Sequence, residues 1–429
     1  MGIQPIFRIC VALGLTLESA PAFKGTELVK EISPSTKASE IQQGEGTEVF
    51  TGAKYAAIVD NSDRLHPSVQ LLDENLTEKT KIVLEEGFIV SVSIAANGLF
   101  VINQQDYSME FRKQAFFYNA TGKLLKKYPY FGGPFVLSPD GRYALISESI
   151  PGEGNDFVIF ETKRWKEKKS DIEPGFGFFS ARFRRDGKIL FIRQDETKDQ
   201  NKWSTKLQIL DLDAAVSSKG IRNPIKSVPL AYDDGLPLTI DPSRLMLQSS
   251  DDGDLFTCAL KDEGSVYYPS RIVIFDKDLN KVTQRKYAEQ ISQVQLVSSR
   301  HMLVSSIESP AKTGEATRFT MAVLEPKEFK ELRKDPIGTG WFHGAIEYGD
   351  EVYFETKNAE DGRIGLYRFS SGKDKPVFEK TGEKPMAKFH GYVFAKEAGV
   401  DDSARNGRFL RPRSKEILKV YRTHIGGKE

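Results

Sequence analysis

The fold class is decided by one stretch, SPDGRYAL at residues 138–145. An Asp-Gly pair between two strand-like runs suits a tight hairpin, because glycine tolerates a positive φ. Similar pairs occur at Asn97-Gly98 and Asp186-Gly187, so that neighbouring turn glycines are 43 and 46 residues apart. Short runs of β-branched and aromatic residues recur along the chain, whereas amphipathic helical periodicity is scarce. The sequence therefore predicts an all-β protein built from repeated units.

The spacing of these turns matches a propeller blade of four strands. The pattern extends in both directions with poorer turns, which gives eight breaks in all and predicts eight blades. The alternatives are a seven-bladed ring with the segment after Gly382 as an irregular cap, and two stacked β-sandwiches, which the even period does not support. The further breaks are expected at Gly52, Pro242-Ser243, Ser298-Ser299, Gly349-Asp350 and Gly399.

Each unit is expected to hold an inner strand, two middle strands and an outer strand, as in residues 88–95, 99–104, 114–118 and 123–128. The last unit is one strand short, since it offers residues 387–394, 408–411 and 417–423. Residues 26–32 are strand-like and can complete it, which closes the ring without an exposed edge. An acceptor side chain that can close the turn before the outer strand recurs at Asp73, Asn119, Asp211 and Asp276.

Residues 138–145, with a looser copy at 184–191, resemble the repeat of the WD40-like and TolB-like β-propellers. The resemblance covers two units, and it implies that this stretch is the turn between the innermost strand and the next. Its implied role is structural, with Asp140 capping the turn and Gly141 supplying the reversal. Asn97-Gly98 keeps only the turn, and residues 241–243 lack the glycine. A resemblance in fold implies no activity.

The first 22 residues differ from the rest of the chain. Arg8 precedes an apolar run over residues 9–17, and Ala20-Pro21-Ala22 offers the small residues of a signal peptidase site. We predict a secretory signal at 1–22, a single propeller domain at 23–429, and an extracytoplasmic location, periplasmic or secreted. The alternative is a buried N-terminal strand or helix. The apolar run is too short to span a bilayer, and no later stretch is suited to it.

Composition argues for a folded core and against a bulk electrostatic function. The chain has 429 residues, 39% of them hydrophobic, with 61 Lys and Arg against 60 Asp and Glu. This balance does not favour nucleic acid or anionic membranes as partners. Only two cysteines occur, Cys10 and Cys258, and Cys10 lies in the predicted signal. We therefore expect no internal disulfide, and a buried Cys258 within a strand.

One histidine motif offers a candidate ligand site. The triplet Phe-His-Gly occurs at residues 342–344 and again at 389–391, 47 positions later. If the two copies occupy matching positions of adjacent blades, His343 and His390 enter the channel side by side, with Trp341 nearby. Paired imidazoles can ligate a metal, bind an anion or act as acid and base. The alternative is a remnant of blade duplication, with each histidine bonded to a neighbouring backbone group.

The other sequence patterns are weaker indications of a functional site. Residues 250–254 bring three carboxylates into one loop, which is either a Ca²⁺ site or a solvated turn. The basic stretches 163–169 and 405–415 are either solvated outer strands or a docking patch. Motifs for a serine hydrolase elbow, haem attachment, a phosphate loop or a zinc helix are missing. The sequence identifies no catalytic residue, metal or cofactor.

Three functions remain open. The first is a monomeric, non-catalytic scaffold outside the cytoplasm, which recognises a protein or envelope component through one loop-bearing face. The second is a lactonase-like, metal-assisted hydrolase that uses His343 and His390. The third is a redox protein with a quinone-type cofactor, which rests only on the count of eight blades.

Overall fold

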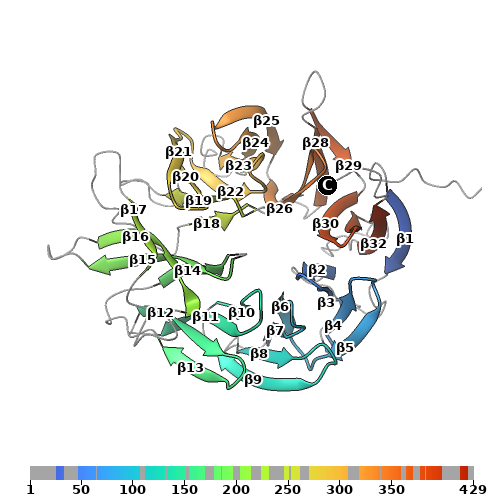
Figure 1. Cartoon of the computed structure of the whole chain (residues 1–429). Helices are drawn as coiled ribbons and strands as arrows, with labels where there is room; N and C mark the ends of the chain where they lie inside the picture. Colours follow the sequence, from blue (N-terminus) through green and yellow to red (C-terminus); the bar gives the residue numbers. More distant parts are fainter. Residues whose placement is uncertain are drawn as a thin grey trace, which may run out of the picture.

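The computed structural model contains eight four-stranded antiparallel sheets arranged as blades around a common axis (Figure 1). The prediction of an eight-bladed β-propeller is therefore confirmed. The residues described are 26–32, 47–63, 65–106, 112–130, 133–150, 154–169, 178–184, 186–196, 203–213, 224–230, 246–250, 253–260, 270–307, 318–338, 340–358, 364–370, 377–381, 383–398 and 416–423.

Blades 1 to 7 each use four consecutive strands, ordered from the axis outward. Blades 1 to 4 are β2 (Thr47–Thr51), β3 (Tyr55–Asp60), β4 (Ser68–Asp73) and β5 (Glu78–Val83); β6 (Phe88–Ile94), β7 (Phe100–Gln105), β8 (Lys113–Tyr118) and β9 (Leu124–Tyr130); β10 (Val136–Leu137), β11 (Tyr143–Ile150), β12 (Gly154–Glu161) and β13 (Lys166–Lys169); and β14 (Phe178–Phe183), β15 (Ile189–Glu196), β16 (Trp203–Leu210) and β17 (Lys226–Leu230). Blades 5 to 7 are β18 (Met246–Ser249), β19 (Leu255–Leu260), β20 (Arg271–Asp276) and β21 (Lys281–Lys286); β22 (Ile291–Leu296), β23 (Met302–Ile307), β24 (Phe319–Glu325) and β25 (Lys330–Gly338); and β26 (Gly340–Tyr348), β27 (Glu351–Asn358), β28 (Ile364–Ser370) and β29 (Val377–Thr381).

Blade 8 joins the two ends of the chain. Its order from the axis outward is β30 (Glu383–Phe389), β31 (Tyr392–Ala398), β32 (Glu416–Thr423) and β1 (Thr26–Ile32). β1 pairs antiparallel with β32, from Thr26 opposite Thr423 to Ile32 opposite Leu418. The predicted closure of the ring by an N-terminal strand is confirmed.

Two predicted breaks are wrong. In blade 5 the turn between the first two strands includes Ser250 and Gly253, since Gly253 has a φ of 77° and its N–H donates to the Ser250 carbonyl at 2.9 Å. Pro242 and Ser243 lie outside the described residues. The even period fails here because the chain between β16 and β18 is longer than the matching part of the other blades.

The second wrong break is in blade 8. The predicted strand 387–394 is divided into the end of β30 and the start of β31 by a turn at His390-Gly391. Both residues have a positive φ, 44° for His390 and 79° for Gly391. The break expected at Gly399 lies outside the described residues.

The core lies between the blades. Each blade is covered by a neighbour on both faces, so the second strands are buried continuously rather than alternately, as in β19, where all six residues are buried. Between blades 2 and 3, Phe135 meets the ring of Phe117 with centroids 5.3 Å apart, and those of Tyr128 and Tyr130 at 5.5 Å, all at edge-to-face angles. These contacts stabilise the stacking of one blade on the next.

Side-chain amides connect neighbouring blades at four of the junctions. In each case one carboxamide donates to a backbone carbonyl of the next blade and accepts from a backbone N–H there. Asn61 bonds Ile89, Asn103 bonds Phe135, Gln248 bonds Val294 and Leu296, and Gln295 bonds Ala345, at 2.7 to 3.0 Å. The inner strands have no sheet partner on the axial side, and these amides satisfy some of their backbone groups.

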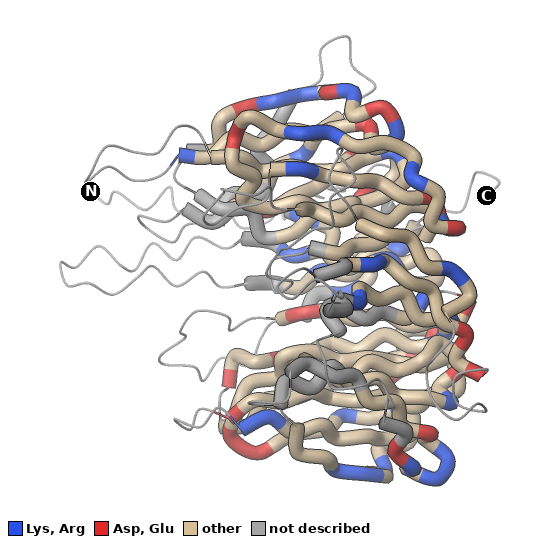
Figure 2. Tube along the Cα trace, turned by 90° about the vertical axis from the view of Figure 1, so that its left-hand side faces the viewer, with Lys and Arg blue, Asp and Glu red and all other residues tan. Residues whose placement is uncertain are grey.

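The turns between first and second strands and those between third and fourth strands lie on one face of the disc, which we call the turn face. Figure 2 shows the disc edge-on, with the strands running from one face to the other. In the blade 3 turn, Asp140 Oδ1 accepts from the Arg142 N–H at 3.0 Å and from Ser138 Oγ at 2.7 Å, and Gly141 has a φ of 74°. The predicted roles of Asp140 and Gly141 are confirmed, as are the turn-closing oxygens of Asp73, Asn119 and Asp276.

Cys258 is fully buried in β19, as predicted. Burial raises the pKa of its thiol to about 12. In a Cys10→Ser variant, where Cys258 is the only thiol, a disulfide reagent at neutral pH should react more than about a hundredfold slower with the native protein than with the protein in urea. Comparable rates in the two states would contradict a closed blade 5.

Candidate functional site

The structure does not place the two histidines at matching positions. His343 lies within β26 at a register shift, since Phe342 pairs with Thr356 and Gly344 pairs with Glu355. His390 lies in the turn after β30, on the turn face. The prediction of side-by-side imidazoles assumed a later break in blade 8, and the turn at His390-Gly391 removes that assumption.

His390 instead connects blade 8 to blade 1. Its side chain is exposed, and Nε2 lies 2.6 Å from the Ala53 carbonyl oxygen in the first turn of blade 1. A bond to a backbone group is what the alternative interpretation expects of this residue. The backbone of Trp341 and His343 belongs to β26, and their side chains lie outside the described part of the structure.

A mostly buried ion pair lies close to the register shift in β26, and no sequence motif marks it. Lys384 Nζ, from the inner strand of blade 8, lies 3.6 Å from Glu355 Oε2 of blade 7. A Cβ built on Gly344 would lie 3.8 Å from the same Nζ. Burial lowers the pKa of Lys384, and the Glu355 carboxylate opposes that shift. The pair is an electrostatic connection between two blades beside the axis.

A second cluster of ionisable groups lies between blades 6 and 7. Glu347 accepts a hydrogen bond from Ser298 Oγ, and its Oε2 lies 3.1 Å from His301 Nδ1. Arg300 donates to the other carboxylate oxygen. The residue types are those of a hydrolase triad, but the serine donates to the glutamate and not to the histidine. The arrangement therefore stabilises the junction and does not activate a nucleophile.

No metal centre is evident in the described residues, among which no three His, Cys, Asp or Glu side chains gather closely enough to hold an ion. Of the acidic loop, Ser250, Gly253 and Asp254 belong to the blade 5 turn, while Asp251 and Asp252 lie outside the described residues. Across the described ranges there is also no helix whose length and apolarity would suit the crossing of a bilayer.

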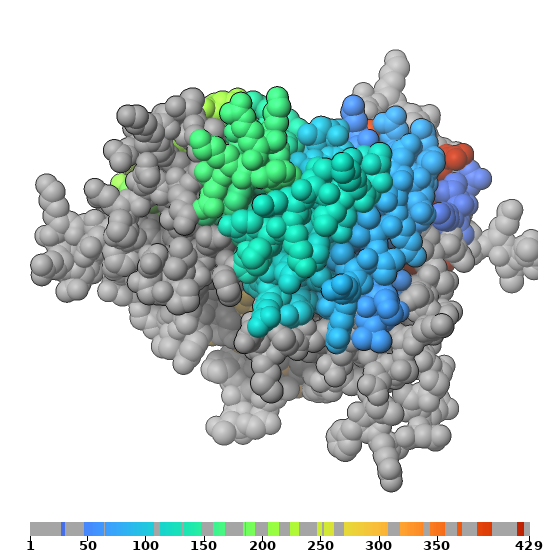
Figure 3. Space-filling model, turned by 90° about the horizontal axis from the view of Figure 1, so that it is seen from below, coloured from blue at the N-terminus to red at the C-terminus, as the bar shows by residue number. Residues whose placement is uncertain are grey.

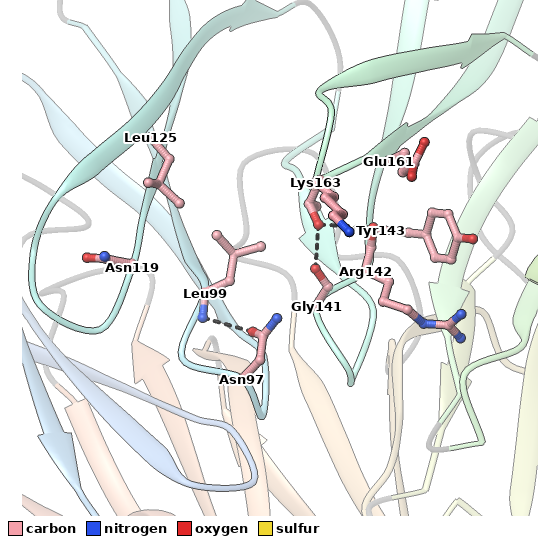
Figure 4. Close-up of a pocket in the computed structure, with 10 residues that line it drawn as sticks. Asn97, Leu99, Asn119, Leu125, Gly141, Arg142, Tyr143, Glu161 and Lys163 are labelled. Carbon is pink, nitrogen blue, oxygen red and sulfur yellow. Dashed lines mark hydrogen bonds between the residues drawn. The ribbon is translucent and has the colours of Figure 1, made fainter.

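A groove on the turn face separates blades 2 and 3, and its volume is ≈ 490 Å³. Figure 4 shows the blade 2 side chains on one side and Gly141 and Lys163 of blade 3 on the other. It is lined by Asn97, Leu99, Asn119, Leu125, Gly141, Arg142, Tyr143, Glu161, Thr162 and Lys163.

Local hydrogen bonds hold the polar wall of this groove in place. Asn97 Oδ1 accepts from the Leu99 N–H at 3.0 Å, and Thr162 Oγ1 donates to the Gly141 carbonyl at 2.6 Å. A Cβ on Gly141 would lie 2.4 Å from Asn97 Oδ1, so the two turns approach too closely for a larger residue. The groove floor is thus formed by two turns in direct contact.

Arg142 fixes blade 3 to blade 4 beside the groove. Its two terminal nitrogens donate to the two carboxylate oxygens of Asp213 at 3.0 and 3.1 Å, and Nε donates to Asp140. Burial opposes the ionisation of Asp140, yet hydrogen bonds from Arg142 and Ser138 hold its pKa below the ordinary value. Because its donors are engaged in this way, Arg142 orders the groove wall rather than reaching for a ligand.

Comparison with known proteins supports the fold alone. No protein-family model matches the sequence, and no curated protein matches it. The quinohemoprotein alcohol dehydrogenase from Comamonas testosteroni is similar over 95% of this chain and 77% of its own, with a TM-score of 0.52 and 9% sequence identity.

Two further solved structures match at lower TM-scores. The computationally designed Ika8 protein matches over 93% of this chain and 100% of its own, with a TM-score of 0.49 and 10% identity. The β-propeller domain of the Trilobed protease from Pyrococcus furiosus covers 80% of this chain and 94% of its own, with a TM-score of 0.41 and 13% identity. At these identities no activity is transferred to this chain.

Proposed function

We propose that this chain is an exported, non-catalytic scaffold that recognises a polypeptide segment of another protein through the groove between blades 2 and 3. The observation that carries the proposal is the composition of that groove. It sets apolar surface from Leu99 and Leu125 beside the amides of Asn97 and Asn119, a combination that polypeptide recognition uses. The blades on either side are rigidly stacked, so the groove is preformed.

Export rests on the pattern of residues 1–22, which lie outside the described structure. N-terminal sequencing of the mature protein tests it directly, and a mature chain that begins at Met1 would refute cleavage. The hydrolase alternative needs His343 and His390 at matching positions of adjacent blades. Because His343 lies within β26 and His390 lies in the turn after β30, their positions count against it.

The groove is tested with Leu125→Ala. Peptides are first selected from a random display library on the immobilised wild-type protein, and their affinities are then measured for each variant. Loss of the apolar contact should weaken binding by about tenfold or more, since burial of a leucine side chain is worth about 1.5–3 kcal/mol.

Leu124→Ala is the matched control. Leu124 is the neighbouring residue of β9 and is 47% exposed, against 41% for Leu125, but only Leu125 lines the groove. Equal peptide binding by the wild type and by Leu125→Ala, or selection of no peptide at all, would contradict the proposed function.

A further inference from the structure

Positive charge is concentrated on blade 2, although the whole chain is nearly neutral. Residues 111–139 contain five Lys and Arg and no Asp or Glu. This segment includes the two outer strands of blade 2, β8 and β9. The turn that follows β12 in blade 3 adds further cations beside it, within the sequence TKRWK at 162–166.

Six cationic side chains of this region are exposed: Lys123, Lys126, Lys127, Lys163, Arg164 and Lys166. We call these six side chains the basic rim. Within the described part of the chain none of the six forms an ion pair. Outer-strand lysines elsewhere do, as Lys79 does with Asp73 and Lys334 with Glu289, both at 2.9 Å. The basic rim therefore keeps its charge available to a partner.

The basic rim and the groove form one continuous surface. Leu125 and Lys163 line the groove from opposite blades. Trp165, in the same turn as Lys163, packs edge-on against Phe117 of blade 2 with ring centroids 4.8 Å apart. Figure 3 shows the outer strands of blade 2 and the neighbouring part of blade 3 side by side on one side of the molecule.

We propose that the groove and the basic rim together bind an acidic polypeptide segment that carries an apolar side chain. The inference rests on the proposed function and adds the chemistry of the partner. The apolar side chain occupies the groove beside Leu125, while Asp and Glu on either side face Lys123, Lys126 and Lys163. Cations without a carboxylate partner attract such a segment over several ångströms and orient it on approach.

A polypeptide fits this surface better than an anionic lipid bilayer. Leu124 and Leu125 are the exposed large apolar residues of β9, and two leucines offer too little apolar surface to insert into a membrane. The groove is also concave, and the amide nitrogens of Asn97 and Asn119, whose oxygens accept within their own turns, can donate to a peptide backbone. A bilayer surface would leave both features unused.

The probe is a fluorescent synthetic peptide of Asp and Glu with one central leucine, followed by anisotropy. We expect binding that weakens steeply as salt is raised, because screening shortens the reach of the exposed charges. Lys126→Glu with Lys163→Glu should weaken it about tenfold or more at low salt. The matched control is Lys277→Glu with Lys281→Glu, which reverses two exposed lysines in the corresponding turn and outer strand of blade 5 and should leave binding unchanged.

Three outcomes would overturn the inference. The first is that a peptide in which lysine replaces every acidic residue binds as tightly as the acidic peptide. The second is that the blade 5 control weakens binding of the acidic peptide as much as Lys126→Glu with Lys163→Glu does. The third is that the protein binds vesicles of equal parts phosphatidylcholine and phosphatidylglycerol but does not bind the acidic peptide. In that case Lys126→Glu with Lys163→Glu would abolish the vesicle binding.

The library peptides separate this inference from the proposed function. If selected peptides depend on Leu125 but are not enriched in Asp and Glu, the groove is a binding site and the acidic partner is wrong. If they do not depend on Leu125, the proposed function itself is wrong.

Discussion

Replacement of Glu347 by alanine should lower the free energy of unfolding by about 3 kcal/mol. Glu347 is buried at the junction of blades 6 and 7, where its carboxylate is bonded by Ser298, Arg300 and His301. Its loss leaves the buried Ser298 and His301 without their acceptor. Urea unfolding followed by far-ultraviolet circular dichroism measures the change.

Asp350→Asn is the control for this cluster. Asp350 also accepts from Arg300, at 2.8 Å, but its side chain is 80% exposed. Exposed ion pairs contribute about 1 kcal/mol or less, so the control should be nearly neutral. A Glu347→Ala variant no less stable than Asp350→Asn would show that the cluster does not stabilise the junction.

The contribution of Glu347 should also depend on pH. Burial opposes its ionisation, but hydrogen bonds from His301 and Ser298 and the charge of Arg300 hold its pKa below the ordinary value of 4.5. A folded-state pKa below the unfolded one means that the stabilisation is present above pH 4.5 and is lost as pH falls through the folded value. The difference between wild type and Glu347→Gln should therefore shrink in acid.

The turns are the part of the fold that can be predicted from the sequence. The Asp-Gly and Asn-Gly pairs specify a reversal through local chemistry, and the side chain of Asp140 bonds the turn as expected. The turn of blade 5 cannot be found from an even period because the interval there is longer, whereas the turn of blade 8 keeps the period, since Gly391 lies 42 positions after Gly349. Blade 5 turns at Gly253, 66 positions after Gly187, and blade 8 turns at His390-Gly391, within the motif that suggests a ligand site.

The groove could not be predicted, because its walls come from separate blades. Asn97 and Gly141 are 44 positions apart, and only the stacking of blades 2 and 3 brings them together. The basic stretch 163–169 is visible in the sequence, but whether it is a solvated strand or a docking patch depends on its neighbours. The structure places Lys163 opposite Leu125, which a sequence pattern cannot show.

The side-chain amide bonds between blades could not be predicted from the sequence either, because they also join separate blades. Asn103 offers the sharpest test of them. Asn103 is fully buried in β7, donates to the Phe135 carbonyl at 2.9 Å and accepts from the Phe135 N–H at 2.8 Å. Asn103→Ala leaves both backbone groups unsatisfied and should cost about 2–4 kcal/mol of unfolding free energy.

Asn75→Ala is the matched control, because Asn75 is exposed in the outer turn of blade 1 and its replacement should cost about 0.5 kcal/mol or less. Hydrogen exchange locates the effect, since the Phe135 amide loses its acceptor in Asn103→Ala and should exchange faster than in wild type. Unchanged protection of that amide, together with unchanged stability, would mean that stacking of apolar side chains alone holds blades 2 and 3 together. The two measurements therefore separate the polar from the apolar contribution to the junction that forms the groove.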